Sequence, residues 1–345
     1  MRRLNHEEGA VAVIVALLTA VVFGFAAISV DSGQLYQERR ELQNGADGAA
    51  IAAAYDCAKG VIECSLTSLE LNNTIDSYAS ANANDGESAA SIVELNLTES
   101  YITVETETLS DGNSFLTHWF AWIFGEDSAT TTVRAQATAK WARTPGTLEI
   151  FPLAFCLDTF NTLTSNGEDF VGPPDYHVYY KTPSNPIVCP TTDDLYEGGF
   201  GWLDLEHSTY SLDPTTCTLT IDADEWMPGI TGEGARINDP WPNCYQKLKD
   251  KILEMDANTN AAPLLVPIFD GWRGSGANGE FHIAGFGAFR PTGFNFGGST
   301  HHPDNMACIN PANRCVRGWF TDFVTFGGVG SAGAYYGVVS VDLIK

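Results

Sequence analysis

The chain has 345 residues, and 44% of them are hydrophobic, which is enough for a membrane anchor and two modest globular domains. Acidic side chains outnumber basic ones by 43 to 18, giving a formal net charge of −25. Because this charge repels nucleic-acid phosphates and anionic lipid head groups, it excludes nucleic acid as a partner. It favours solubility in a salty or cation-rich exterior over a specific cation site.

The N-terminal region is typical of a membrane anchor. Arg2 and Arg3 precede the segment 10–30, which contains no charged residue. A helix of this length rises about 30 Å, the thickness of the hydrocarbon core of a bilayer. The two arginines favour a cytoplasmic N-terminus and therefore an extracytoplasmic C-terminal body.

A cleavable signal peptide is the alternative, with Gly24-Phe25-Ala26 as a passable cleavage site. However, the apolar run is longer than an ordinary signal-peptide core, and the helical pattern continues beyond it. We therefore predict one helix from about Gly9 to Lys59, ended by Gly60. Small and apolar residues form a stripe on its outer half, which we interpret as an interaction surface. This stripe consists of Leu35, Leu42, Ala46, Ala49 and Ala53.

The N-terminal sequence closely resembles TadG-like and TadE-like proteins of the tight-adherence (Flp) pilus assembly system. The resemblance rests on EGAVAV at 8–13, VDSG at 30–33 and ERRELQN at 38–44, followed by Ala46-Asp47 and a run of alanines. It is strong over about the first 55 residues and looser to about Arg143. It implies a membrane-anchored, non-enzymatic assembly component whose partners are other pilus or secretion components.

Two departures limit what the resemblance implies. Type IV-like prepilins carry a glutamate five residues after the cleaved glycine, where this chain has Ile14. Some TadG-like proteins also contain a von Willebrand A domain with a D-x-S-x-S metal motif, which this sequence lacks. Neither processing after Gly9 nor a metal-dependent adhesion site is therefore expected.

Residues 60–143 are predicted to complete a pilin-like α+β module around the outer half of the helix. The spacing predicts a second helix over 66–80 and a hairpin of strands at 92–97 and 101–106. An apolar helix or helical turn is expected over 115–124, and a strand over 129–141.

Residues 144–345 are predicted to form a β-rich, disulfide-bonded extracytoplasmic domain. Strands are expected over 148–157, 264–269, 280–289 and 334–343, with one helix over 240–254. Gly285 and Gly287 indicate a bulge or a close backbone approach. Seven aromatic residues of this domain could form a glycan-binding face, but burial statistics favour a core. They are Trp202, Phe281, Phe286, Phe289, Phe294, Trp319 and Phe320.

The eight cysteines predict disulfides in an oxidising compartment. Loop closure is least costly for near neighbours, which favours Cys57–Cys64 and Cys308–Cys315. Neighbour pairing of the remaining four gives Cys156–Cys189 and Cys217–Cys244. Eight cysteines allow 105 connectivities, so these pairings are preferences among alternatives.

No catalytic, cofactor or metal site is predicted, and no small-molecule ligand is expected. His301-His302 with Asp304 nearby lacks further spaced metal ligands, and His282 is interpreted as a satisfied strand histidine. Asp270 is expected to cap the loop GWRGSGANG, which lacks the lysine of a phosphate loop. A cell-surface adhesin or envelope-binding module with the same anchor is the alternative function. A secreted hydrolase has no motif in its favour.

Overall fold

The computed structural model describes most of the chain. The described residues are 7–60, 62–109, 112–121, 130–143, 146–170, 172, 176–181, 188–191, 195–204, 212–213, 215–230, 244–274, 279–297, 301–303, 308, 314–326, 330 and 334–344. They divide into two compact units, one of Met1–Lys140 with Asp342–Lys345 and one of Trp141–Val341. Helices and strands occur together, which confirms the mixed α and β content predicted from sequence.

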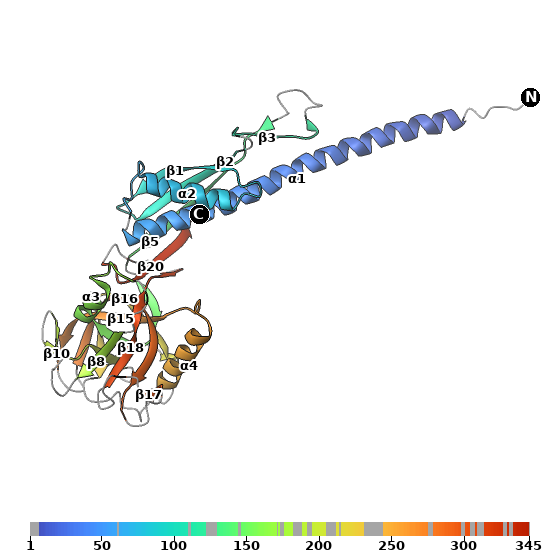
Figure 1. The fold of residues 1–345 in the computed structure, drawn as a ribbon. Coiled ribbons are helices and arrows are strands. Elements are labelled where there is room, and N and C mark those ends of the chain that lie inside the picture. Colours follow the sequence, from blue (N-terminus) through green and yellow to red (C-terminus); the bar gives the residue numbers. More distant parts are fainter. Residues whose placement is uncertain are drawn as a thin grey trace, which may run out of the picture. The chain divides into compact units, whose positions relative to one another are not determined.

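The first unit is built on helix α1 (Glu7–Lys59), the long helix in Figure 1. Its end matches the prediction, because Gly60 adopts a φ of 70° and its amide still bonds to Asp56. Helix α2 (Leu69–Ala81) follows, and the hydroxyl of Ser68 accepts a hydrogen bond from the amide of Leu71 at its start.

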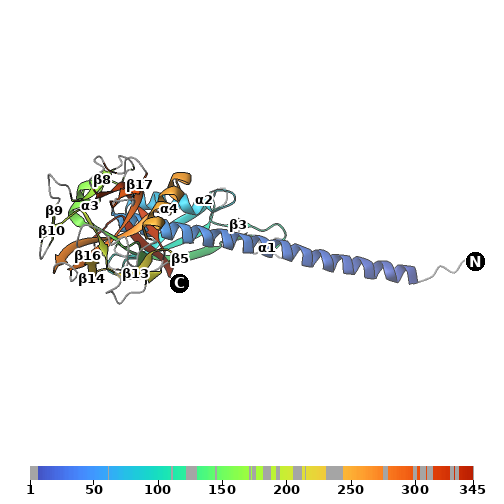
Figure 2. The ribbon, with the colours of Figure 1, turned by 90° about the horizontal axis from the view of Figure 1, so that it is seen from below.

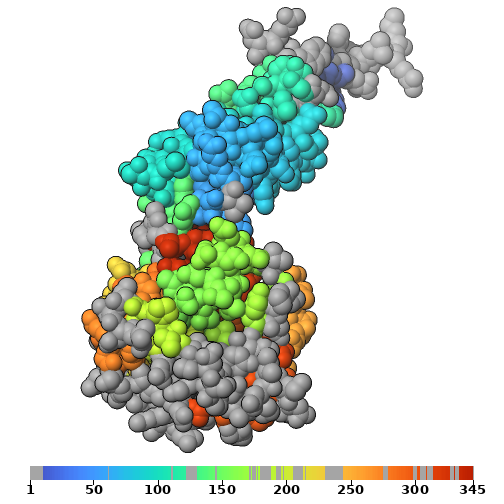
Figure 3. Space-filling model, turned by 60° about the vertical axis from the view of Figure 1, so that its left-hand side comes forward, coloured from blue at the N-terminus to red at the C-terminus, as the bar shows by residue number. Residues whose placement is uncertain are grey.

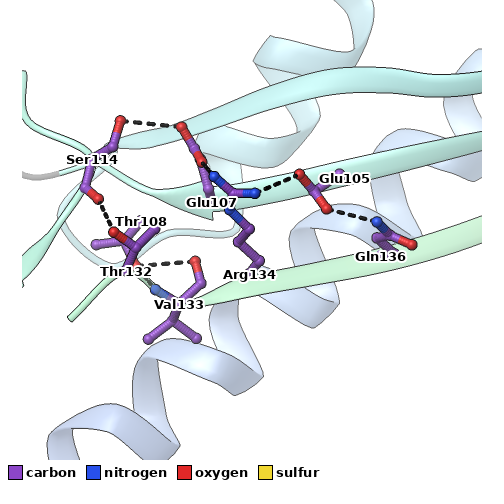
Figure 4. A network of polar contacts seen from close by, with 8 residues as sticks. All are labelled: Glu105, Glu107, Thr108, Ser114, Thr132, Val133, Arg134 and Gln136. Atoms are coloured by element: carbon purple, nitrogen blue, oxygen red, sulfur yellow. Dashed lines mark hydrogen bonds and ion pairs between the residues drawn. The ribbon is translucent and has the colours of Figure 1, made fainter.

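A small antiparallel sheet packs against α1. Three of its strands are β1 (Ser88–Asn96), β2 (Tyr101–Thr108) and β5 (Arg134–Ala142), and β2 pairs with both neighbours. Alternate residues of β2 are buried, beginning at Ile102. The other face is polar: Arg134 contacts the carboxylates of Glu105 and Glu107 (Figure 4). One face is therefore available to cover α1, and the other meets water.

Strands β3 (Leu116–Thr117) and β4 (Thr130–Thr131) form a short antiparallel pair in the same unit. The helix expected over 115–124 is therefore wrong for Leu116 and Thr117. Thr117 pairs with Thr130, so backbone bonding to a distant strand outweighs the local apolar pattern. Residues 122–124 lie outside the described part.

The second unit contains a large sheet with the order β14-β11-β7-β15-β16-β18-β8. Its strands are β7 (Leu153–Cys156), β8 (Tyr176–Lys181), β11 (Phe200–Leu203), β14 (Glu225–Ile230), β15 (Leu264–Arg273), β16 (Gly279–Asn295) and β18 (Arg314–Thr321). Because β14 also pairs with β16, five of these strands close a ring. Residue 284 is bulged where Ile268 pairs with Gly285, which confirms the irregularity predicted near that glycine.

The remaining elements lie outside this strand order, and all belong to the second unit except the end of β20 from Asp342 onward. The strands are β6 (Thr147–Ile150), β9 (Val188–Pro190), β10 (Leu195–Glu197), β12 (Leu212–Asp213), β13 (Thr218–Asp222), β17 (His301–His302), β19 (Phe323–Thr325) and β20 (Val338–Ile344). The helices are α3 (Leu157–Thr164) and α4 (Cys244–Ala257). The single strand expected over 148–157 is instead β6 and β7, because Phe151 bonds to Leu265 at the break.

Aromatic side chains fill the interior of the second unit. Phe155, Phe281, Phe289 and Phe294 are buried and pack against neighbouring rings, such as Phe155 on Phe289 at 4.8 Å. The expectation that the strand aromatics form a core rather than a glycan face is confirmed for Phe281, Phe289 and Phe294.

Four disulfides join Cys57 to Cys64, Cys156 to Cys189, Cys217 to Cys244 and Cys308 to Cys315. These are the four pairs favoured by neighbour pairing. Each pair lies within one unit, and the Cα–Cα distances are 5.2 to 6.0 Å.

Candidate membrane anchor and assembly interface

The first half of α1 carries apolar side chains, and nearly all of them are exposed. The helix is long and apolar enough to cross a membrane, with a mean hydropathy of 2.8 in its most apolar window and none of that window buried. Leu17, Val22, Phe23 and Phe25 are each more than 60% exposed. An uncharged helical surface of this kind is favourable in lipid and costly in water.

Polar contact with the rest of the unit begins where the apolar run ends. Asp31 is only 7% exposed, and its carboxylate accepts hydrogen bonds from the backbone amides of Trp119 and Phe120 at 3.0 to 3.3 Å. One turn further along, the Gln34 side chain donates to the carbonyl of Thr117 at 3.4 Å. Asp31 and Gln34 lie three residues apart, so both reach the same side of the helix.

The outer half of α1 is buried within its own unit. Leu42, Ala46, Ala49 and Ala53, from the predicted interaction stripe, are at most 2% exposed, and Leu35 is half-buried. Helix α1 makes its contacts here with α2 and β2. The ribbon of Figure 2 shows α2 beside α1, and the space-filling view of Figure 3 shows the blue and cyan parts of this unit as one continuous surface. These four side chains therefore serve packing inside the unit.

Small residues permit this packing because they let backbones approach closely. A Cβ atom on Gly45 would lie 3.2 Å from the carbonyl oxygen of Ala79 on α2. On the sheet side, the buried hydroxyl of Thr106 donates to the carbonyl of Leu42 at 2.8 Å. Gly45 thus lowers the helix propensity of α1, and the alanines limit its side-chain bulk, which allows close contact with α2 and the sheet.

Acidic residues of α1 also face its own unit. Glu41 accepts hydrogen bonds from the backbone and side-chain nitrogens of Asn84, at 3.0 and 2.6 Å. Burial raises the pKa of the Glu38 carboxyl; a hydrogen bond with Thr108 opposes the rise, and the Asp85 and Glu41 carboxylates add to it.

The opposite side of this part of α1 is exposed. Tyr36, Arg40 and Asn44 lie four residues apart in sequence and share one side of the helix. The Arg40 guanidinium lies 5.8 Å from the centre of the Tyr36 ring. Residues 36–44 therefore divide into a buried side that holds the unit together and an exposed side with polar and aromatic groups.

The second unit contains a polar cluster around His282. His282 and Asp270 are considered separately in the sequence analysis, where their contact is not predicted. His282 lies 2.6 Å from Asp270 and 3.1 Å from Asp224, and its ring packs near Trp226. His282 is thus a satisfied strand histidine, as predicted, whereas Asp270 contacts this histidine rather than capping a loop. Gly271–Arg273 belong to β15 and Gly279 begins β16, so the expected loop is shorter; residues 275–278 lie outside the described part.

Among the residues that the structure describes, no group of three or more His, Cys, Asp or Glu side chains could hold a metal ion. His301 and His302 form β17 and pair with β16. Asp304, the third member of that candidate site, lies outside the described residues.

Sequence reasoning did not identify the contacts of Asp31 and Gln34. Asp31 enters the sequence analysis only within the motif VDSG and Gln34 only as part of the predicted helix, and their partners lie 83 to 89 residues away in the sequence. A single acidic residue directly after the uncharged run is the one local signal that could have drawn attention to this position.

Comparison with known families supports the resemblance in the N-terminal segment. Residues 9–56 match the family of putative Flp pilus-assembly TadE/G-like (Tad) domains. The matched segment covers the exposed apolar half of α1 and nearly all of its buried outer half. No curated protein and no solved structure matches the chain.

Proposed function

We propose that this chain is a membrane-anchored, non-enzymatic component of Flp pilus assembly that acts through protein–protein contacts at the outer face of the membrane. The observation that carries the proposal is the two-part helix α1. Its apolar half is exposed, its outer half is buried in a folded unit, and the family match covers both.

In this proposal the chain has three functional segments. Residues 1–59 form the anchor helix, with the membrane-spanning part at 10–30 and the N-terminus in the cytoplasm. Residues 60–143 complete a pilin-like module around the outer half of the helix, and residues 144–345 form the disulfide-bonded outer domain. The long helix against the antiparallel sheet β1-β2-β5 supports the pilin-like reading.

The partner surface in this proposal is the exposed side of the outer helix. The stripe predicted from sequence is buried, so contacts with other pilus or secretion components would use Tyr36, Arg40 and Asn44. Arg40 presents a positive charge on a chain whose net charge is −25, which suits a partner with an acidic surface.

Deletion and complementation test the function. A strain lacking the gene should lose surface pili, and the intact gene should restore them. Val21→Arg places a charge in the apolar half of α1. The gene with this substitution should fail to restore pili, and its product should no longer be found in the membrane fraction. Val21→Leu is the matched control and should restore both properties. Normal pilus formation in the deletion strain would contradict the proposal.

A charge reversal tests the partner surface. Arg40→Glu should leave the chain in the membrane but reduce its co-purification with pilus components, because it reverses the charge facing the partner. Lys140→Glu changes the charge equally at an exposed position on β5 and should have no effect. Equal recovery of pilus components with both variants would exclude this side of the helix as the interface.

A further inference from the structure

A groove beside the apolar half of α1 brings an aromatic residue from a distant segment to the membrane-spanning part. It has a volume of about 440 Å³ and is lined by six residues of α1 between Ala20 and Val30 and by Phe120. The lining contains no charged or polar side chain. Phe120 thus lies alongside residues within the segment 10–30, which begin about three helical turns before Asp31.

The neighbouring residue Trp119 points outward from this position. Its side chain is 70% exposed, and Phe115 and Phe120 are also partly exposed. Tryptophan and other aromatic residues are enriched where membrane proteins meet the interface between hydrocarbon and water, because their rings are apolar and can also form polar contacts. The segment 115–121 carries no acidic or basic residue other than His118, which is buried.

The contacts with α1 also satisfy backbone groups that would be costly to leave unpaired near lipid. The amides of Trp119 and Phe120 bond to the Asp31 carboxylate, and the carbonyl of Thr117 accepts from Gln34. Unpaired backbone groups are costly in hydrocarbon, so non-helical backbone close to a bilayer needs such partners. Asp31 therefore both fixes the height of the segment on the helix and pairs its amides.

We propose that residues 115–121 form a second membrane contact, in which Trp119 and Phe120 insert into the outer interface of the bilayer beside α1, held there by Asp31 and Gln34. The proposal rests on α1 spanning the membrane, as in the proposed function. The partner is the lipid surface, because the aromatic groove is continuous with the helix surface that the lipid would cover. Since the chain is strongly acidic, the lipid should be zwitterionic rather than anionic.

Quenching of tryptophan fluorescence by brominated lipids tests this contact. The full chain would be reconstituted into phosphatidylcholine vesicles brominated either near the head groups or deep in the acyl chains. The chain has eight tryptophans, so the signal of residue 119 is the difference between the intact chain and Trp119→Phe. Shallow bromines should quench this difference signal at least twofold more strongly than deep ones.

A second variant tests the role of Asp31. Asp31→Ala removes the acceptor of both amides and should reduce quenching of the Trp119 signal by at least half. Asp47→Ala changes an acidic residue on the same helix away from the segment and should leave the quenching unchanged. Equal quenching of the Asp31 and Asp47 variants would overturn the assigned role of Asp31.

Extraction of the same vesicles with alkaline carbonate separates the failure of this inference from the failure of the anchor. If the chain stays in the membrane but the Trp119 signal is not quenched by lipid, the second contact is wrong and the anchor stands. The same conclusion holds if the signal is shielded from an aqueous quencher and from lipid alike, which would indicate a protein partner. If the chain is extracted, the anchor and the second contact both fail.

Discussion

Ala49 shows how closely the side chains of α1 pack against their own unit. It is fully buried on the side of the helix that meets α2 and β2. Ala49→Leu would add three carbon atoms to this interior, and overpacking of this kind costs about 1–3 kcal/mol. We expect a lower thermal midpoint for the full chain in detergent, measured by circular dichroism. Arg39→Leu adds a leucine at an exposed position of the same helix and should change the midpoint far less. Equal effects would contradict the packing assignment.

Glu38 provides a pH-dependent contribution to stability. Burial raises the pKa of its carboxyl, so the folded state holds the proton more tightly than the unfolded state does. The stabilising effect of this proton is complete below the ordinary glutamate pKa of about 4.3 and is lost as pH rises through the raised value. At neutral pH the charged carboxylate therefore destabilises the fold relative to a neutral side chain.

Glu38→Gln should consequently raise the thermal midpoint at pH 7 by a few degrees at most, and the difference from the unchanged chain should vanish towards pH 4. Arg40→Gln, which alters an exposed residue half a turn away, should show no such dependence. A difference that stays constant between pH 4 and pH 7 would show that ionisation of Glu38 is not its cause.

At the scale of single elements, the disulfides differ in the length of chain that they close. Cys57 and Cys64 are seven residues apart, and Cys156 and Cys189 are 33 apart. In the chain-entropy account, longer loops give more stabilisation, roughly 2 kcal/mol for the first and roughly 4 kcal/mol for the second. Replacing both cysteines of a pair by alanine should therefore lower the free energy of unfolding more for Cys156–Cys189. Denaturant titration of the full chain would measure both losses, with limited proteolysis used to follow the unfolding of each unit. A larger loss for the shorter loop would contradict this account.

The same elements show which features the sequence can predict. The end of α1 and the hairpin of β1 and β2 follow from local periodicity and from Gly60, so their predictions are close to the structure. Helix α3 was missed because it begins directly after the strand residue Cys156, within an apolar run that local patterns assign to the strand.

Features that depend on distant pairing were beyond local analysis. The ring of five strands closes through pairing of β14 with β16, whose paired residues are 50 to 58 positions apart in the sequence, as from Gly229–Gly279 to Glu225–Ile283. The features of the candidate site likewise divide into those that follow from local sequence and those that depend on distant contacts. The apolar run and the small-residue stripe could be predicted, whereas burial of the stripe and the contacts of Asp31 depend on segments far along the chain.

At the scale of the whole molecule, the two halves of α1 require different surroundings. The exposed apolar half is suited to lipid, and the disulfides of both units are suited to an oxidising compartment. Arg2 and Arg3 before the apolar run favour a cytoplasmic N-terminus. Together these features lead us to predict that the body lies outside the cytoplasmic membrane.

Protease accessibility tests this orientation. In spheroplasts with intact membranes, added proteinase should digest the body and leave only a small membrane-embedded fragment that includes residues 10–30. In inverted vesicles the body should be protected until detergent is added. A cytoplasmic marker protein should show the opposite protection, which confirms that each preparation is sealed.

Arg2→Glu together with Arg3→Glu should weaken the preference for a cytoplasmic N-terminus, since positive charges near a membrane segment set its orientation. Part of this double variant should then be protected from proteinase in spheroplasts. Protection of the unchanged body in spheroplasts would place it in the cytoplasm, where disulfides are rare, and would contradict both the orientation and the redox argument.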